Sequence, residues 1–102
     1  MIYLCKLLKQ LKFLLDEHVE GFDKKLLELG HRVEYAKKLR EKEEKFRNDF
    51  NLLLHAQENN MIFVTKDKEP GQTCKDNNYP CIWISDEKIF EEMILPKIKD
   101  FE

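Results

Sequence analysis

Carboxylate side chains follow apolar segments of this sequence at several separate places. Carboxylate oxygens are the ligands that Mg²⁺ and Mn²⁺ prefer in proteins, and such an ion assists the attack of water on a phosphodiester. The acids therefore suggest metal-dependent hydrolysis of a phosphate ester, provided that the fold brings them together. The candidate ligands are Asp16, Glu17, Asp49, Asp67 and Glu69.

Four neighbouring side chains could assist at the same place. His18 could bind the ion or orient a substrate, although a histidine that begins a loop is commonly a plain surface residue. Thr65 could hold a water molecule by a hydrogen bond, and its alternative role is that of a β-branched strand residue. Lys66 and Lys68 could bind a phosphate group. These four are the predicted substrate-binding residues.

The apolar pattern predicts alternating strands and helices to carry these residues. Short apolar runs favour strands, whereas apolar residues spaced by three and four favour helices. Asn48 and Ser85 are predicted N-caps, Gly30 predicts a helix end, and Pro96 predicts a kink or break. The predicted order is a strand at residues 12–15, a helix ending at 29, a strand at 31–36, a loop or exposed helix at 37–47, a helix from 48, a strand at 61–65, a loop at 66–79, a strand at 80–85 and a helix from 86.

This alternation predicts an α/β fold with three layers, α/β/α, around a small parallel sheet of about four strands. In such a sheet the carboxyl ends of the strands share one edge, so we expect the acids to converge there. Asp49 and Asp86 also have a structural explanation, because an acid at a helix start is stabilising by about 0.3–1 kcal/mol. For Asp86 we prefer that explanation. Asp16 differs, because a charge at the end of an apolar strand is costly unless it is paired.

Composition indicates one globular domain over residues 1–102. Its residues are 42% hydrophobic and 37% charged, and 18 Lys and Arg nearly balance 20 Asp and Glu. We expect residues 12–102 to form the α/β core and residues 1–11 a helical extension, with a strand from Ile2 as the alternative. Three cysteines without a CxxC pair predict reduced thiols and a cytoplasmic location. The lysines within residues 1–15 argue against a signal peptide or a membrane helix.

Charge is distributed unevenly along the chain. Residues 37–47 hold six basic and three acidic residues, whereas residues 86–102 hold six acidic and three basic ones. Such runs commonly form solvated helix faces. The basic run nevertheless offers Lys37, Lys38 and Arg40 as contacts for an RNA backbone. Tyr35 and Phe50 could stack on RNA bases, although we expect both to face the core.

The order of these motifs resembles the PIN-like proteins of the DUF5615 group, which are relatives of PIN-domain ribonucleases and often the toxin half of a toxin–antitoxin pair. The resemblance spans residues 12–84 and rests on LLDE after the first strand, LGHRV at the first helix end and FVTKD after the next helix. It implies that Asp16, Asp49 and Asp67 are catalytic and bind the metal, with Glu17 and Glu69 as further ligands. The implied activity is cleavage of single-stranded RNA by an Mg²⁺- or Mn²⁺-dependent endoribonuclease.

The resemblance also implies an antitoxin protein or a second copy of the chain as the partner, and no membrane. The chain departs from the group at His18, where members commonly have Asn, and at Glu69 and Pro70, where they commonly have Asp and Phe. The alternative function is a catalytically silent module that binds protein or RNA through the same edge. A receiver-type phosphoacceptor domain is disfavoured, because no strand-end lysine follows residues 80–85.

Overall fold

A computed structural model describes residues 9–102 of the chain. Most of the helical extension predicted over residues 1–11 lies outside the described residues, and residues 9–11 are not helical. The elements are β1 (Lys12–Leu15), η1 (Glu17–Phe22), α2 (Asp23–Glu28), β2 (Arg32–Tyr35), α3 (Ala36–Lys42), η2 (Glu44–Arg47), α4 (Asp49–Glu58), β3 (Met61–Thr65), α5 (Lys68–Asp76), β4 (Cys81–Trp83), α6 (Asp86–Ile89), η3 (Phe90–Ile94), α7 (Leu95–Ile98) and η4 (Lys99–Phe101).

Four parallel strands form one sheet in the order β2-β1-β3-β4. Strand β1 lies inside the sheet, pairing Leu15 with Tyr35 of β2 on one side and with Val64 of β3 on the other. The carboxyl ends of the strands therefore lie at one edge, which is where open α/β sheets hold their sites. The predicted fold class is confirmed.

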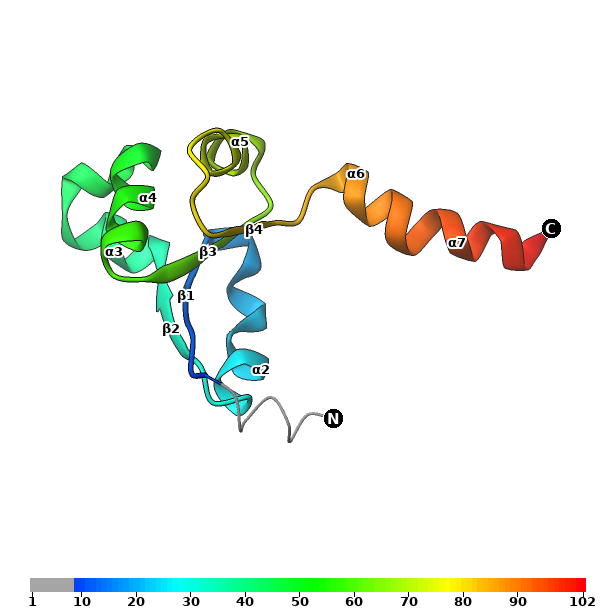
Figure 1. The fold of residues 1–102 in the computed structure, drawn as a ribbon, viewed down its shortest axis with the longest axis horizontal. Helices are drawn as coiled ribbons and strands as arrows, with labels where there is room; N and C mark the ends of the chain where they lie inside the picture. Colours follow the sequence, from blue (N-terminus) through cyan, green and yellow to red (C-terminus); the bar gives the residue numbers. More distant parts are fainter. Residues whose placement is uncertain (1–8) are drawn as a thin grey trace.

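Helices cover both faces of the sheet, so the fold has three layers (Figure 1). On one face, α3, η2, α4 and α5 enclose a core that includes Leu14, Phe63, Leu52 and Leu53. On the other face, η1 and α2 pack against a smaller cluster around Phe13, which also contains Leu15, Val19 and Val64. Because side chains of a strand alternate between faces, neighbouring residues of β1 serve different cores. The continuous apolar run that predicted this strand is typical of a strand covered on both sides.

Most predicted helix ends are confirmed. Asn48 caps α4, its side chain accepting hydrogen bonds from the backbone of Phe50 and Asn51, and Ser85 caps α6 in the same way through Lys88. Gly30 follows α2 with a φ of 92°, a conformation that glycine adopts without strain. These local signals needed no tertiary contact to be readable, because each satisfies backbone groups within its own turn.

The loop predicted over residues 66–79 is wrong, because α5 occupies much of it. Pro70 lies in the first turn of this helix, where the missing N–H would have had no partner. Gly71 lies under Trp83 of the neighbouring strand, and a Cβ there would lie 2.5 Å from the indole ring. Proline and glycine therefore mark a helix start and a close contact here, rather than a loop.

The helix that follows β4 extends away from the rest of the molecule (Figure 1). Pro96 was predicted to kink or break it, but the chain stays helical, and the π-helical segment η3 ends two residues before the proline. Such a segment accommodates a residue that cannot donate to the preceding turn. No helix formed by residues 9–102 has both the length and the apolar character needed to cross a membrane.

Candidate functional site

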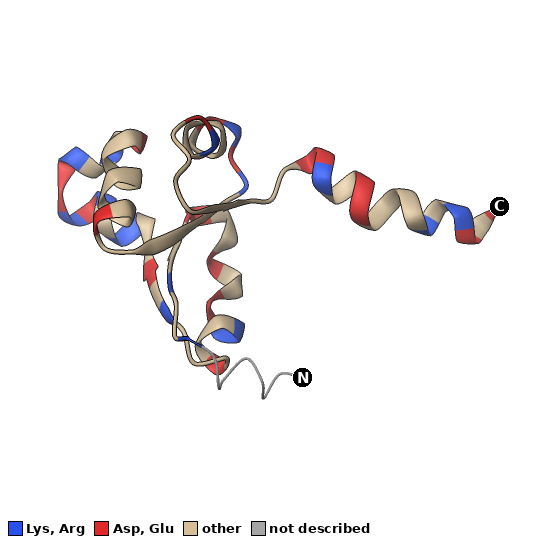
Figure 2. Ribbon diagram, in the orientation of Figure 1, with Lys and Arg blue, Asp and Glu red and all other residues tan. Residues whose placement is uncertain are grey.

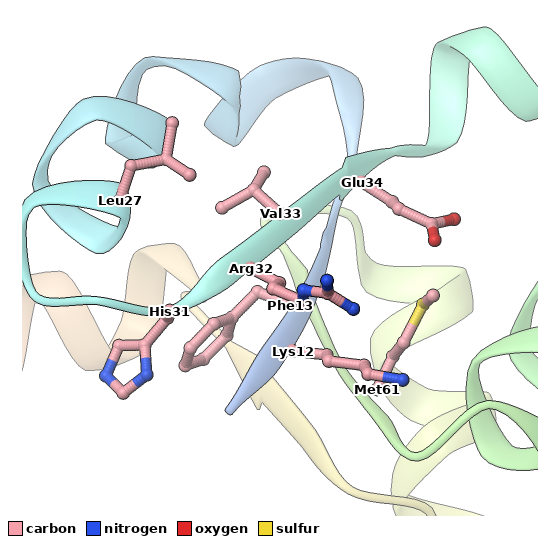
Figure 3. A pocket seen from close by; sticks show the side chains of 8 residues that line it. All are labelled: Lys12, Phe13, Leu27, His31, Arg32, Val33, Glu34 and Met61. Carbon is pink, nitrogen blue, oxygen red and sulfur yellow. The ribbon is translucent and has the colours of Figure 1, made fainter. Parts of the chain in front are cut away.

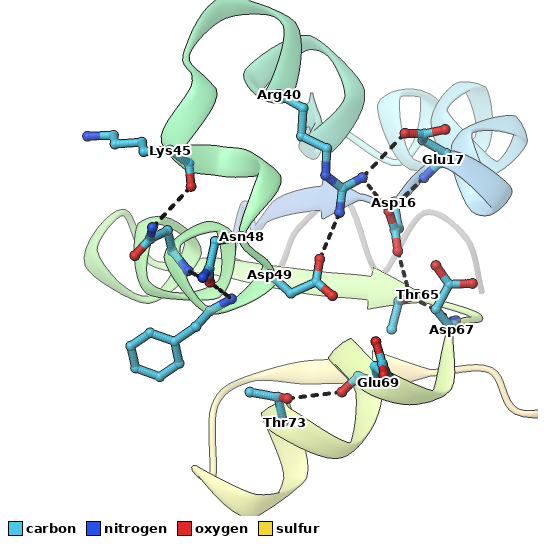
Figure 4. A network of polar contacts seen from close by, with 12 residues as sticks. Asp16, Glu17, Arg40, Lys45, Asn48, Asp49, Thr65, Asp67, Glu69 and Thr73 are labelled. Atoms are coloured by element: carbon cyan, nitrogen blue, oxygen red, sulfur yellow. Dashed lines mark hydrogen bonds and ion pairs between the residues drawn. The ribbon is translucent and has the colours of Figure 1, made fainter.

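Asp16 lies at the carboxyl end of β1 with 2% of its surface exposed. Its Oδ1 accepts a hydrogen bond from the backbone N–H of Glu17 at 2.9 Å, so the side chain caps η1. Its Oδ2 accepts a hydrogen bond from the hydroxyl of Thr65 at 2.8 Å (Figure 4). A buried carboxylate needs such partners, because burial without them strongly disfavours the charged form. The cap and the hydroxyl together fix the direction of both oxygens.

Thr65 connects two of the predicted acids. It is the fully buried last residue of β3, and its Oγ1 both donates to Asp16 and accepts from the backbone N–H of Asp67 at 3.0 Å. The hydroxyl thus holds the turn after β3 against the end of β1. These contacts position two of the predicted acids, and the hydrogen bond from Thr65 to a water molecule stays a prediction.

Arg40 of α3 bridges three of the predicted acids (Figure 4). Its Nη1 lies 3.1 Å from Asp16 Oδ1 and 3.4 Å from Glu17 Oε1, and its Nη2 lies 3.3 Å from Asp49 Oδ1. Asp49 is the first residue of α4, so one guanidinium joins the ends of β1 and the start of a helix 33 residues later. The sequence had proposed Arg40 for the RNA backbone; the structure instead places it inside the acidic site.

The remaining predicted residues lie around this centre. His18 and Glu69 are exposed, and the positive field of His18 lowers the pKa of Asp67 slightly against the stronger opposing effects. Glu69 lies in the first turn of α5, and its side chain makes no hydrogen bond or ion pair with any described residue. Lys66 and Lys68 are exposed on either side of Asp67. The predicted set is therefore brought to one edge, with Glu69 the least engaged member.

Of the two stacking candidates, Tyr35 packs against the cluster around Phe13, as expected, whereas Phe50 does not face the core. Phe50, which was expected to face the core, is 45% exposed. Tyr35 is half-buried, and its hydroxyl donates a 2.7 Å hydrogen bond to Asp23, so its polar end is already engaged. Lys38 lies over the Tyr35 ring at 5.1 Å, which occupies one face of that ring. Of the two aromatic residues, only Phe50 offers a free side chain for a base.

Crowding of carboxylates raises the pKa of Asp67. Loss of surrounding water is the largest cause, followed by the negative charge of Asp16, and Asp49 adds a smaller effect of the same sign. All three disfavour the ionised form of Asp67. The carboxyl edge of the sheet, called the rim below, thus holds more negative charge than its basic residues offset.

Replacing Asp67 with asparagine should raise the stability of the fold at neutral pH. A pKa raised on folding means that ionisation penalises the folded state, with the full penalty present above the folded pKa and none well below the unfolded value. Asparagine removes the charge and remains a good helix N-cap. The carboxylate of Asp67 is exposed and water screens its charge, so we expect a gain of at most about 0.5 kcal/mol at pH 7. We expect no gain near pH 3, below the usual aspartate pKa of about 3.9. Urea unfolding at the two pH values measures this, and an equal gain at both would contradict the charge explanation.

The donor chemistry of the rim suits a hard divalent cation, since every candidate ligand is a carboxylate. Within residues 9–102, however, no group of three or more His, Cys, Asp or Glu side chains is arranged to hold a metal ion. The positive charge paired with Asp16, Glu17 and Asp49 is instead the guanidinium of Arg40. The arrangement is that of an acidic site closed by a guanidinium.

One cavity lies close to the carboxyl edge of the sheet and another lies far from it. One of about 360 Å³ is lined by residues at the starts of the strands, including Lys12, His31, Arg32 and Met61, so it lies at the opposite edge of the sheet (Figure 3). Another of about 630 Å³ lies between α5 and α6, and Lys66, Lys68 and Lys75 line it. Figure 2 shows both basic and acidic residues on α5, and likewise over α3 and η2. The second cavity includes Lys66 and Lys68, the residues on either side of Asp67, and Asp86, Glu87 and Glu91 also line it.

Comparison of the chain with family models, with curated proteins and with solved structures finds no match.

Proposed function

We propose that this chain is a PIN-like protein of the DUF5615 type that cleaves single-stranded RNA with Mg²⁺ or Mn²⁺. The observation that carries the proposal is the convergence of Asp16, Asp49 and Asp67, which are distant in sequence, at the carboxyl edge of the sheet. A purely structural role explains the acid at a helix start, but it does not explain a buried aspartate crowded by two others.

Charge at the edge supports the proposal. Four carboxylates gather at this edge: those of Asp16, Glu17, Asp49 and Asp67. Among the described residues, Arg40 is the one Lys or Arg that forms salt bridges there, and it pairs with the first three. A phosphodiester approaching this edge would meet further repulsion unless a cation offset the excess. Asp16, Asp49 and Asp67 would hold that cation, with Arg40 released from Asp16. When bound, the ion would activate water and neutralise charge on the scissile phosphate.

The substrate path would follow the lysines beside the site. Lys66, Lys68 and Lys75 line the cavity of about 630 Å³ together with Asp86, Glu87 and Glu91, and phosphate contacts by such lysines supply most of the sequence-independent affinity for nucleic acid. Phe50, exposed near Asp49, offers a surface on which an unpaired base could stack. These features favour a flexible single strand, and an antitoxin protein covering the same edge would be the natural inhibitor.

A second candidate function is a catalytically silent module that binds protein or RNA through this edge. One observation favours it: Arg40 already pairs with three carboxylates, and no three-ligand group is formed by the described residues. If these pairs persist in solution, the edge is a fixed structural network. The two candidates therefore differ in whether a divalent ion displaces Arg40.

Calorimetric titration with Mn²⁺ separates the two candidates. The nuclease proposal expects binding to the wild-type chain in the ~millimolar range or tighter, because carboxylate sites of moderate charge bind in that range. Asp16→Asn should abolish it. Asp86→Asn is the matched control, since Asp86 is exposed in the first turn of α6 and belongs to no salt bridge described. Absence of any heat from wild type at ~10 mM Mn²⁺ would favour the silent module.

A further inference from the structure

The helical segment after β4 is almost entirely exposed. Every residue from 86 to 102 is exposed except Ile89, which is half-buried. The apolar side chains on it are large, and Phe101 at its end is 89% exposed. Phe90, Ile94 and Ile98 recur every four residues, so they form one stripe along the helix. A stripe of this kind is normally buried against another surface.

Such a helix has little stability of its own. Isolated helices shorter than ~12–15 residues are marginal in water even when rich in alanine. This one has 16 residues, only slightly more, and it contains Pro96 and several β-branched or aromatic residues. Burial of the stripe is therefore needed to stabilise the helical form. The position of the helix, away from its own body, leaves that burial to another surface (Figure 1).

The same chain has an uncovered apolar groove of about 230 Å³. It lies between η1 and α2 on one side and β3 and β4 on the other, and Lys25 is its one charged lining residue. Ile82 and Phe22 at the groove are 47% and 45% exposed. No helix formed by residues 9–102 covers this part of the sheet, although three-layer folds normally bury it. The apolar lining is completed by Phe13, Leu15, Val64 and Ile84.

We propose that the C-terminal helix of one copy occupies this groove in a second copy, and that the exchange is reciprocal. Ile84 lines the groove and Ser85 caps the helix, so the helix leaves its own body directly at the groove edge and points outward. Reciprocal exchange about a two-fold axis covers both grooves and both helices and forms a closed dimer. The hinge is the short segment around Ser85.

Charge and size agree with this assignment. Glu87, Glu91 and Glu92 lie along the first turns of the helix, and the groove contributes Lys25 as a cation. A helix of 16 residues is about 24 Å long. Each copy contributes one helix stripe and one groove. A standard stable interface of ~800 Å² per partner therefore requires ~400 Å² at each of the two contacts.

Light scattering after size-exclusion chromatography tests the exchange. We expect wild type to have twice the 12.4 kDa of one chain at ~50 µM, and Ile82→Glu, Phe22→Glu and Ile94→Glu each to weaken dimerisation by at least ~100-fold and elute as monomers. Phe22 and Ile82 lie on different elements, so a folding defect in one does not decide the result. Circular dichroism confirms that each monomer retains its α/β content.

Two control variants give the comparison. Leu27→Glu introduces the same charge at an apolar side chain that is 51% exposed but lines the cavity at the opposite edge, and Lys99→Glu alters the polar side of the helix. Both should remain dimers. A wild-type monomer would overturn the proposal, including the case in which the chain's own residues 1–8 cover the groove. A dimer lost in Ile94→Glu but kept in both groove variants would also overturn it, because the helices would then pair with each other.

Discussion

Replacing Arg40 with methionine should lower the free energy of unfolding by about 3 kcal/mol at pH 7. Asp16 would remain buried with its ionised carboxylate and would keep only the hydrogen bonds from Thr65 and the backbone of Glu17. Removing one partner of a buried pair costs about 3–5 kcal/mol, and the lower value applies because Arg40 is itself 20% exposed. Methionine keeps most of the apolar stem of arginine, so the change isolates the charge. Urea unfolding measures the loss.

Arg47→Met is the matched control for this result. Arg47 lies on η2, is exposed, and forms no salt bridge with any described residue, so its replacement should cost less than about 0.5 kcal/mol. Combining Arg40→Met with Asp16→Asn should recover much of the loss, since the uncompensated charge is then gone. An equal cost of Arg40→Met in both backgrounds would show that Arg40 acts through packing and not through Asp16.

The fold was largely predictable because its strongest signals are local or periodic. The apolar run around Leu14 predicted a strand covered on both faces, and Gly30, Asn48 and Ser85 marked helix ends through their own backbone geometry. The helix α5 was missed for a tertiary reason. Gly71 is required there by the indole of Trp83, and no pattern in the sequence reveals that two residues 12 positions apart are in contact.

The acids of the candidate site were predictable from the sequence, but the role of Arg40 as their partner was not. Topology alone places Asp16 and Asp67 at one edge, because both follow parallel strands. Arg40 lies one helical turn into α3 among six basic residues of one run, and nothing local distinguishes it from Lys37 or Lys38. Its planar guanidinium, which can bind several carboxylates at once, is the physical difference from those lysines. An arginine on the helix that follows an outer strand is the signal that could have been used.

The edge therefore combines two opposing demands. Burial and the negative charge of Asp16 raise the pKa of Asp67, whereas the guanidinium of Arg40 forms salt bridges with Asp16, Glu17 and Asp49. A fold selected for stability alone would gain from replacing at least one carboxylate with a neutral residue. The proposed function accounts for acids that lie together despite this cost, and it assigns the central role to Asp16.

Asp16→Asn should reduce cleavage of single-stranded RNA by about 10³-fold, which corresponds to about 4 kcal/mol of lost transition-state stabilisation. Asparagine has nearly the same shape. Its oxygen can accept from the backbone N–H of Glu17 and from Arg40 while its NH2 donates to the hydroxyl oxygen of Thr65, so the fold should persist. The charge that would bind the divalent ion is lost. Single-turnover cleavage of a labelled RNA in Mn²⁺ measures the effect, and unfolding in urea confirms that both proteins are folded.

Asp100→Asn is the control for cleavage, because it removes an exposed acid of η4 that lines no part of the cavity between α5 and α6. It should cleave at the wild-type rate. Cleavage by wild type should stop in EDTA and return with Mn²⁺, since the proposed chemistry requires the ion. If Asp16→Asn cleaves as fast as wild type, or if EDTA leaves the rate unchanged, the three aspartates do not form a metal-dependent site. Arg40 would then be a permanent part of a binding surface, and the cluster would owe its charge to recognition of a partner.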